Sequence, residues 1–587
     1  MTTILGKDAP LEDSIATMSE GLKRLGFDIE EVSWLNPIPN VWSVHIHDRN
    51  CNLLFANGKG MSREAALASA LGEFFERLST NYYFADYFLG ADNAAADFVH
   101  YPQERWFKVS AKGWPEGLLD EATRNHYDLH GELSPASLID INSGNAERGI
   151  CALPFVKQRT DETVWFPVNV IGNLYVSNGM ASGNSMWEAR VHALSEIFER
   201  HIKNTIISSG ISLPSIPDAI INRYPRVRAA LKSLRNHGFV IEVRDASLGG
   251  KFPLVNVSLF HPQSGGCYAS FGAHPKFQVA LERAVTELLQ GRALDQLDQF
   301  PMPVFDIEEA AEPHNLEAHF IDSSGVVAWD LFSANTDYPF TEWNIEGDTR
   351  AEFEELCRRI HRVDMDIYIA DYEHLGFYTC RILVPGMSEI YPVDELIWSN
   401  NNAAAHLRPL LLALPDLDQE QYADLYDALD EAGFDEQYQV AELIGIVADA
   451  GSPWETLRIG ELKCLLALQL EDPQGAFEMS EWLLAFQHLP APRMRLFRCL
   501  HQVLGIELSE SRELDSYLSV LKRIYTPELV KRCREMIQGQ ELFSDYGSHD
   551  ERLKRFKLHQ QLLSAWHLLD LAKRSQEKRS QEKPIDS

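Results

Sequence analysis

Two eighteen-residue segments of this chain carry the same acidic pattern. They read GMSREAALASALGEFFER at residues 60–77 and GNSMWEARVHALSEIFER at residues 183–200. At a constant shift of 123 residues they align without a gap and share nine of eighteen positions. Each ends in Glu-x-x-Glu-Arg, which places two carboxylates on one face of a helix and apolar residues on the opposite face. The repetition indicates either a duplication or a shared chemical task.

The repeated carboxylates could bind a hard cation. They are Glu73 and Glu76 in the first segment and Glu196 and Glu199 in the second, and a partial third copy, FGAHPKFQVALERAVTELLQ, contributes Glu287. If the acidic faces converge, carboxylates that close cannot all stay ionised unless cations neutralise them. Oxygen ligands without thiolates favour Mg²⁺, which usually completes its shell with water and substrate phosphates. A nucleoside triphosphate is therefore the implied partner.

Phosphate also needs hydrogen-bond donors, and the sequence offers two kinds. The stretches Gly58-Lys59-Gly60 and Gly183-Asn184 precede predicted helices, whose N-terminal N–H groups favour anions. Arg200 and Arg283 could each donate two parallel hydrogen bonds. The sequence contains no GxxxxGK[ST] motif, so a P-loop fold is not expected.

Each of these features also has a purely structural interpretation. A single Glu-x-x-Glu is usually a solvated helix face, and a glycine before a helix is usually a simple turn. Arg77 could only pair with a carboxylate, and His192 could be a hydrogen-bonded packing residue. His274 lies just before the third helix, and a position near a ligand is favoured more for this residue than for His192.

The elements that must position these residues repeat as well. From residue 41, alternating apolar and polar residues flank a turn at 48–50 and end in glycines, which predicts a β-hairpin that leads into a helix. Residues 164–183 repeat the order of strand, Gly-Asn turn, strand and glycine loop, and residues 252–292 form a weaker third copy. Three hairpin–helix units predict an α+β fold, an antiparallel sheet with helices on one face.

After about residue 415 the strand patterns stop. Amphipathic segments joined by short polar or proline-containing turns predict an all-helical domain of stacked pairs, loosely similar to a tetratricopeptide array. Apolar stripes on these helices lead us to expect a homodimer. The expected divisions in this part of the chain are a helical domain at 415–575 and a disordered tail at 576–587.

Composition narrows the function classes. A chain of 587 residues predicts two to four domains, and a formal net charge of −33 argues against broad binding to nucleic-acid phosphate or anionic lipid. The N-terminus does not resemble a secretory signal, and no apolar run approaches a membrane span. The eight cysteines are scattered without zinc spacing. We expect a reduced, cytoplasmic protein without direct nucleic-acid or membrane contacts.

The three acidic segments, in this order, resemble the nucleotide-binding signatures of the YcaO family. RILVPGM at 381–387 resembles a later strand of the same family, and the resemblance covers about residues 57–410. Family members bind ATP and magnesium and use ATP to activate a peptide amide oxygen, which leads to azoline, thioamide or amidine backbones. The resemblance implies a YcaO-type ATP- and Mg²⁺-binding domain at 57–410, with an N-terminal segment at 1–56 packed on it and with ATP and Mg²⁺ as cofactors.

The resemblance also implies two overlapping sets of site residues, and it assigns no catalytic residue. The set implied to contact ATP is Lys7, Ser14, Ser69, Glu73, Asn184, Arg200 and Arg283. The set implied to bind magnesium is Glu73, Glu76, Glu188, Glu196, Glu199 and Glu287. Lys7 and Ser14 belong to the N-terminal segment, which is expected to close over the phosphates.

The whole chain is most similar to stand-alone bacterial members that assist β-methylthiolation of a small-subunit ribosomal protein. This implies an ATP-hydrolysing enzyme of the amide-activating type, with a ribosomal protein as substrate or a methylthiotransferase as partner. Two alternatives stay open: a non-catalytic nucleotide-binding scaffold that docks a modifying enzyme, and a cyclodehydratase-like enzyme. The sequence ends in EKPIDS rather than the proline-rich tail of azoline-forming members, which argues against heterocycle formation. Methylthiotransferase chemistry within the chain is not expected, because three clustered cysteines for an iron–sulfur cluster are missing.

Overall fold

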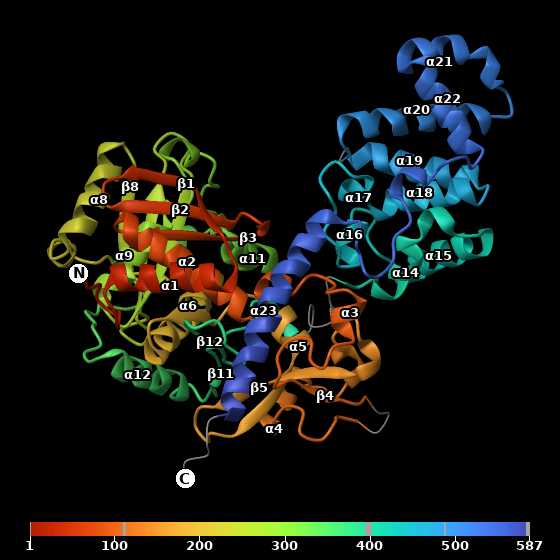
Figure 1. The fold of residues 1–587 in the computed structure, drawn as a ribbon. Coiled ribbons are helices and arrows are strands. Elements are labelled where there is room, and N and C mark those ends of the chain that lie inside the picture. Colours follow the sequence, from red (N-terminus) through yellow and green to blue (C-terminus); the bar gives the residue numbers. More distant parts are fainter. Residues whose placement is uncertain (1, 110–112, 142, 394–401, 487–488, 583–587) are drawn as a thin grey trace.

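The structure is a computed structural model that describes residues 2–109, 113–141, 143–393, 402–486 and 489–582 (Figure 1). It contains three antiparallel sheets in its first two thirds and helices in the remainder. This arrangement confirms the predicted α+β fold with a helical C-terminal region.

The first hairpin–helix unit is present as predicted. Strands β2 and β3 pair across the turn at Arg49 and Asn50, β1 pairs with the other edge of β2, and α2 follows β3. Ser62 caps α2 by accepting a hydrogen bond from the backbone N–H of Ala65. The bounds are α1 (Leu11–Leu25), β1 (Ile29–Ile38), β2 (Val41–Asp48), β3 (Cys51–Gly60) and α2 (Arg63–Ser79). Because β3 crosses residue 56, the segment 1–56 shares a sheet with the domain that follows it.

The second unit is not the predicted hairpin. The Gly172-Asn173 pair lies in a π-helix (Ile171–Tyr175) instead of a turn, and β6 and β7 pair with different strands. Neighbouring apolar residues, which also suit a strand, here pack into the core around Tyr175. The bounds in this region are α3 (Ala91–Ala94), β4 (Arg105–Phe107), α4 (Glu121–Tyr127), β5 (Ile150–Lys157), β6 (Thr163–Pro167), α5 (Val168–Val170), β7 (Met180–Gly183) and α6 (Met186–Ser208).

The third unit is again a hairpin that leads into a helix. Strands β9 and β10 pair in antiparallel register, β8 pairs with β9, and α9 packs on this sheet. The bounds are α7 (Asp218–Ile221), α8 (Pro225–Asn236), β8 (Val240–Asp245), β9 (Leu254–Phe260), β10 (Cys267–Ala273), α9 (Phe277–Glu287), α10 (Ile307–Ala311), α11 (Pro313–Ile321), α12 (Thr349–His361), β11 (Tyr368–Tyr372) and β12 (Tyr378–Leu383).

Glycines at the ends of the strands let the three key helices pack closely against their own sheets. A Cβ added to Gly58 would lie 2.0 Å from the carbonyl oxygen of Ala66 in α2, and one added to Gly272 would lie 2.3 Å from that of Ala280 in α9. At Gly183, the backbone nitrogen of Ala189 in α6 would be 2.6 Å away. These glycines therefore have a structural reason to be present that does not depend on a ligand.

The largest sheet brings the three helices together. Its strand order is β4-β5-β11-β12-β7, with β6 paired to β5. Helix α6 packs against β7 and β12 of this sheet and also against β10, while α2 packs against β7. Ser182 of β7 donates a hydrogen bond of 2.7 Å to the carbonyl oxygen of Gly72 in α2. Helices α2, α6 and α9 are thus held between the sheets.

The helical region has its own core, and its helices stack in pairs. Helices α18 and α19, α19 and α20, and α20 and α22 pack on one another (Figure 1). Phe88, from the first half of the chain, enters this core and lies under the guanidinium group of Arg408. The bounds are α14 (Arg408–Leu412), α15 (Gln419–Ala432), α16 (Val440–Leu443), α17 (Pro453–Thr456), α18 (Ile459–Gln469), α19 (Pro473–Phe486), α20 (Ala491–Glu507), α21 (Leu518–Tyr525), α22 (Pro527–Ile537) and α23 (Lys557–Glu582).

The last helix, α23, returns to the first part of the chain. Leu562, Trp566 and Leu569 line one stripe of α23 and join the core formed by α1, α2 and the first sheet (Figure 1). The expected disordered tail at 576–587 is therefore wrong as far as residue 582, because this docking is continued by a regular helix; residues 583–587 lie outside the described residues. No described helix is long and apolar enough to cross a membrane.

Candidate functional site

The predicted acidic faces of α2 and α6 do meet, and two of their glutamates pair with arginines of the same helix. Arg77 Nη2 lies 2.6 Å from Glu73 Oε1, and Arg200 Nη1 lies 2.9 Å from Glu196 Oε1. Each pair is one helical turn apart, the spacing at which side chains are neighbours on a helix surface. All four side chains are only 19–25% exposed. Arg77 therefore pairs with a carboxylate, as its purely structural interpretation expected.

Two further pairs join different elements. Arg283 Nη2 in α9 lies 3.4 Å from Glu199 Oε2 in α6, and the same oxygen accepts a 3.1 Å hydrogen bond from the backbone N–H of Ala273. The Lys59 ammonium at the end of β3 contacts the Glu287 carboxylate at the end of α9. These contacts tie the three repeated units into one cluster, which we call the carboxylate cluster: Glu73, Glu76, Glu196, Glu199 and Glu287.

Glu76 differs from the other members of the carboxylate cluster because no basic side chain forms an ion pair with it among the described residues. Removal from water, followed by the charges of Glu196 and Glu73, raises the pKa of Glu76 well above its ordinary value. The pKa of Glu196 is raised for the same first reason, with Glu199 and Glu73 adding to it against the pull of Arg200 and Arg283. The cluster therefore has a deficit of positive charge around Glu76.

The basic residues around the carboxylate cluster are also perturbed. Burial and the neighbouring Arg283 lower the pKa of Lys59 to about 8, although Glu199, Glu73 and Glu196 pull in the opposite direction. Burial and Arg283 also lower the pKa of His192 well below its ordinary value, so the imidazole is neutral and Nε2 can accept the 2.6 Å hydrogen bond from Arg283 Nη1. Positive and negative groups are thus held at close quarters with little water between them.

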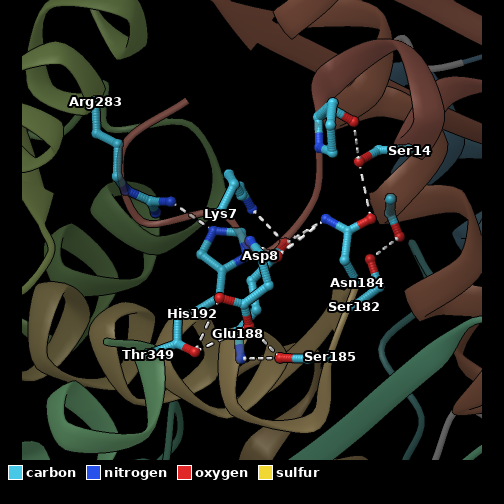
Figure 2. Close-up of polar contacts among 12 residues, drawn as sticks. Lys7, Asp8, Ser14, Ser182, Asn184, Ser185, Glu188, His192, Arg283 and Thr349 are labelled. Carbon is cyan, nitrogen blue, oxygen red and sulfur yellow. Dashed lines mark hydrogen bonds and ion pairs between the residues drawn. The ribbon is translucent and has the colours of Figure 1, made fainter. Parts of the chain in front are cut away.

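The residues that precede α1, which we call the N-terminal arm, cover one side of α6 (Figure 2). Lys7 Nζ lies 3.1 Å from Glu188 Oε1, and the backbone N–H of Asp8 donates a 2.8 Å hydrogen bond to Glu188 Oε2. Asn184 donates to both oxygens of Glu188, at 3.1 and 2.9 Å, and accepts a 2.8 Å hydrogen bond from Ser14 Oγ. Burial alone would raise the pKa of Glu188, but Lys7 and these hydrogen bonds hold it below its ordinary value.

The arm is fixed at Asp8 by hydroxyl groups from two distant helices. Ser185, the N-cap residue of α6, donates to the Asp8 carboxylate, and Thr349 of α12 donates at 3.0 and 2.9 Å (Figure 2). A Cβ added to Gly6, whose φ is +78°, would lie 2.7 Å from the ring of His274. The backbone of the arm therefore passes directly over this buried histidine, which lies beside Arg283 and Lys7.

The structure places the predicted residues in two groups. The carboxylate cluster with Arg200 and Arg283 forms one group, and Lys7, Ser14, Asn184 and Glu188 form the other, about two helical turns earlier along α6. Ser69 is exposed on α2, and no described residue hydrogen-bonds its side chain. Arg283 touches both His192 and Glu199 and so lies at the junction between the groups.

Sequence reasoning missed the contributions of several residues. Lys59 was expected to offer only a backbone N–H, and Asp8 and Thr349 were not expected at all. The position of Lys59 between two glycines and directly before α2 was a usable signal. No signal existed for Asp8 and Thr349, because 341 residues separate them in the chain.

The arrangement suits a hard cation together with an anionic ligand. Every side chain of the carboxylate cluster offers only oxygen, Lys59, Arg200 and Arg283 contact its members, and Lys7 pairs with Glu188 about two helical turns away. No group of three His, Cys, Asp or Glu residues among those described could hold a metal by itself. Magnesium fits this finding, because it usually takes one or two carboxylates and completes its shell with water and phosphate oxygens.

The chain matches two family models. Residues 57–388 match the model described as YcaO cyclodehydratase, ATP- and Mg²⁺-binding, and residues 404–575 match the YcaO cyclodehydratase C-terminal domain. The first match contains every residue of the carboxylate cluster. The second ends within α23.

Two curated relatives span almost the whole chain. The ribosomal protein S12 methylthiotransferase accessory factor YcaO of Escherichia coli is 51% identical over 97% of this chain and 98% of its own length. An uncharacterized protein of Haemophilus influenzae is 48% identical over 98% of this chain and 99% of its own length.

Two solved structures are more distant. A heterocyclase in complex with substrate and cofactor gives a TM-score of 0.44 at 16% identity, over 65% of this chain and 53% of its own. YcaO from Methanopyrus kandleri bound with AMPPCP and Mg²⁺ gives 0.39 at 17% identity, over 65% of this chain and 92% of its own.

Proposed function

The chain belongs to the YcaO family, and from this premise we propose that the carboxylate cluster and the N-terminal arm together form its site for ATP and Mg²⁺. The family domain at residues 57–388 is ATP- and Mg²⁺-binding, so the proposal concerns which residues do the binding. One observation carries it: Glu76 lies among like charges, forms no ion pair with a basic side chain among the described residues, and has a pKa raised by loss of water and by Glu196 and Glu73. A bound cation would remove that cost.

In this proposal the carboxylates divide the work of metal binding. Glu76 and Glu196 are the strongest candidates for direct contact with Mg²⁺, because their surroundings most disfavour the free anion. The full proposed magnesium set is Glu73, Glu76, Glu188, Glu196, Glu199 and Glu287. When bound, Mg·ATP supplies an activated phosphoryl group and the free energy of its transfer.

The basic residues are proposed to bind phosphate oxygens. In the structure Lys7 pairs with Glu188 at 3.1 Å and Arg283 pairs with Glu199 at 3.4 Å. Each base could exchange its carboxylate for a phosphate oxygen. Such an exchange would free Glu188 and Glu199 to take part in metal binding. The full proposed nucleotide set is Lys7, Ser14, Ser69, Glu73, Asn184, Arg200 and Arg283, and it includes Ser69 because that exposed hydroxyl lies one turn before Glu73.

We further propose that the chain hydrolyses ATP while it assists the methylthiolation of ribosomal protein S12. The support is the relative named as an S12 methylthiotransferase accessory factor, which is 51% identical over nearly the full length of both chains. The client could be S12 itself or the methylthiotransferase. The expected homodimer and the cytoplasmic location stay predictions.

The test is ATP turnover by the full-length chain, alone, with S12, and with S12 and the methylthiotransferase. We expect Mg²⁺-dependent hydrolysis that a partner stimulates and that Glu199→Ala abolishes. Binding of Mg·ATP without turnover under all three conditions would favour the alternative of a nucleotide-binding scaffold. No binding of Mg·ATP at all would contradict the assignment of the site.

A further inference from the structure

A second polar site lies beside the carboxylate cluster, in a cavity of about 110 Å³. Its lining residues include those that follow the C-terminal end of α2 and residues of α5, the π-helix, β11, β12 and α23. Its walls include Tyr82, Asn169, Gly172, Arg381 and Trp566. None of these residues was assigned to nucleotide or metal above. We call this space the side cavity.

Residues in the wall of the side cavity contact residues of the proposed ATP site. The ring of Tyr82 lies under the guanidinium of Arg77, 5.5 Å from carbon to ring centre, and Arg77 pairs with Glu73. Thr80, also in the cavity wall, hydrogen-bonds through its N–H and its hydroxyl to the carbonyl oxygen of Glu76, at 3.1 and 2.8 Å. A group bound in the side cavity would thus lie next to the residues proposed to hold Mg·ATP.

Arg381 gives the side cavity its chemical character. This residue is only 5% exposed, and its Nη2 donates hydrogen bonds to the carbonyl oxygens of Ile171 and Val176. Its Nε is buried without any acceptor and is closed to a ligand, whereas its Nη1 is not fully buried and has no hydrogen-bond or ion-pair partner among the described residues. Burial also lowers its pKa. A buried guanidinium with an unused donor calls for an oxygen acceptor from outside.

The backbone that Arg381 holds is strained. The π-helix Ile171–Tyr175 ends at Val176, a β-branched residue at φ +48° and ψ −113°. Such conformations persist only where surrounding contacts enforce them, and π-helical turns are frequent at functional sites. Beside the strained turn, Asn173 donates a 3.0 Å hydrogen bond to Asn169, whose own amide is buried against residues 137–139.

The size and lining of the side cavity fit a piece of polypeptide. Its volume is well below the roughly 300–1,000 Å³ of drug-sized ligand pockets, so it would hold one residue and its flanking peptide groups. Aromatic walls from Tyr82, Tyr372 and Trp566 would cover an aliphatic portion or a peptide plane of that segment.

We propose that the side cavity receives a segment of ribosomal protein S12 as the protein client, and that Arg381 donates a hydrogen bond to a carbonyl or carboxylate oxygen of that segment. This inference rests on the proposed function, because it places the client next to the Mg·ATP site. The client segment would thereby be positioned beside Glu73 and Glu76. The wall formed by Trp566 makes α23 part of the client site.

Gly172 allows a clean test. It lines the side cavity, is exposed and has no positive φ, and an added Cβ would meet no atom within 4 Å, so we expect a larger side chain there to leave the fold intact and to reduce the space in the cavity. The measurement is binding of fluorescently labelled S12 to the full-length chain with Mg²⁺ and a non-hydrolysable ATP analogue. The variants are Gly172→Phe, Gly172→Ala as a graded control, and Val520→Phe, which adds the same ring to an exposed position on α21. Affinity for the nucleotide analogue is measured in parallel.

We expect Gly172→Phe to weaken S12 binding at least tenfold, Gly172→Ala to weaken it little, and Val520→Phe to leave it unchanged. Nucleotide affinity should stay within twofold of wild type in all three. Arg381→Lys, which keeps the charge but loses the fork, should also weaken S12 binding. Equal S12 affinity for Gly172→Phe and wild type would overturn the proposal, and so would the absence of S12 binding to wild type. If wild type did not bind the nucleotide analogue at all, that result would instead contradict the proposed ATP site.

Discussion

The carboxylate cluster and the core of the helical domain each contain a buried glutamate, but only the glutamate of the helical domain forms an ion pair with a base. In the helical domain, the fully buried Glu461 of α18 pairs with Arg493 of α20, which also donates a 2.6 Å hydrogen bond to Tyr546. Burial raises the pKa of Glu461 and Arg493 pulls it down, so one acid meets one base. In the other region Glu76 has no such partner. The difference teaches that Glu461 is neutralised by a base of its own domain, whereas the carboxylate cluster leaves the charge of Glu76 to be neutralised by a ligand.

This comparison predicts different consequences when one acid is removed. Deleting Glu461 leaves Arg493 buried without its partner, which is costly. Deleting Glu76 removes a repulsive charge and leaves no base unpaired. The first change should therefore damage the fold, and the second should damage only ligand binding.

The largest expected effect is on the fold of the helical domain. Glu461→Ala should lower the free energy of unfolding by about 3–5 kcal/mol, the usual cost of breaking a buried ion pair from one side. Chemical denaturation followed by circular dichroism measures it. The double variant Glu461→Ala with Arg493→Met is the control and should recover part of the loss. A change below about 1 kcal/mol for Glu461→Ala would remove the contrast between the two regions.

The next effect is on nucleotide affinity. Glu73→Ala and Glu199→Ala should each weaken Mg·ATP binding on the order of a hundredfold, about 2.7 kcal/mol. Each variant also leaves one partly buried arginine, Arg77 or Arg283, without its carboxylate, so we expect a loss of stability but a folded chain. Chelation of Mg²⁺ should have a comparable effect on the wild-type chain. Calorimetric titration with a non-hydrolysable analogue measures the affinity, and thermal unfolding checks the fold. Wild-type affinity in both variants would sink the assignment of these carboxylates.

A third prediction concerns Lys573, a buried base without a carboxylate partner among the described residues. Its burial should make the free energy of unfolding depend on pH. Lys573 of α23 donates 2.7 Å hydrogen bonds to Asn81 and to the carbonyl oxygen of His100, and no described carboxylate forms an ion pair with it. Burial lowers its pKa to about 7, with Asp570 and Glu104 opposing the shift. Between pH 7 and pH 9 the unfolded chain therefore binds more protons at this site than the folded chain. Stability contributed by Lys573 should rise by about 2 kcal/mol over that window.

The check is the unfolding free energy at pH 7 and pH 9 for wild type and Lys573→Met. The gain between the two pH values should be larger in wild type than in Lys573→Met, whatever the absolute stabilities. Because only the difference between the two chains counts, other titrating groups cancel. Identical pH slopes would show that Lys573 stays protonated through this range.

A smaller effect is expected at Arg283, which joins the two groups of the proposed site. Arg283→Lys keeps the charge but loses the two-pronged donor geometry that reaches His192 and Glu199. We expect about a tenfold loss of nucleotide affinity or turnover, and a greater loss for Arg283→Ala. If Lys is silent where Ala is damaging, only the point charge matters there.

The convergence of the acidic helices could be predicted because it depends on local signals. The shift of 123 residues aligns Ser62 with Ser185, and both are N-cap residues in the structure. Helix periodicity then fixed which glutamates share a face. The helical region was likewise visible from its amphipathic pattern.

The missed features depend on contacts between distant segments. The Gly-Asn pair at 172–173 resembles a hairpin turn, and only packing around Tyr175 makes the segment a π-helix. The docking of α23 on α1 and α2 joins residues about 490 apart in the chain, as Lys573 and Asn81 show. A chain ended near residue 415 would therefore expose the core around Leu78 and would not test the helical domain alone. Asp8 and Thr349 met for the same reason.

The central claim is that Glu76 is left without a partner because a bound cation supplies it. The direct measurement is the unfolding free energy of wild type and Glu76→Gln, first in chelator and then with Mg²⁺ and a non-hydrolysable ATP analogue. In chelator the variant should be at least as stable as wild type, and with ligand wild type should gain stability that the variant lacks. A variant that is less stable in chelator yet gains as much from the ligand would contradict the account.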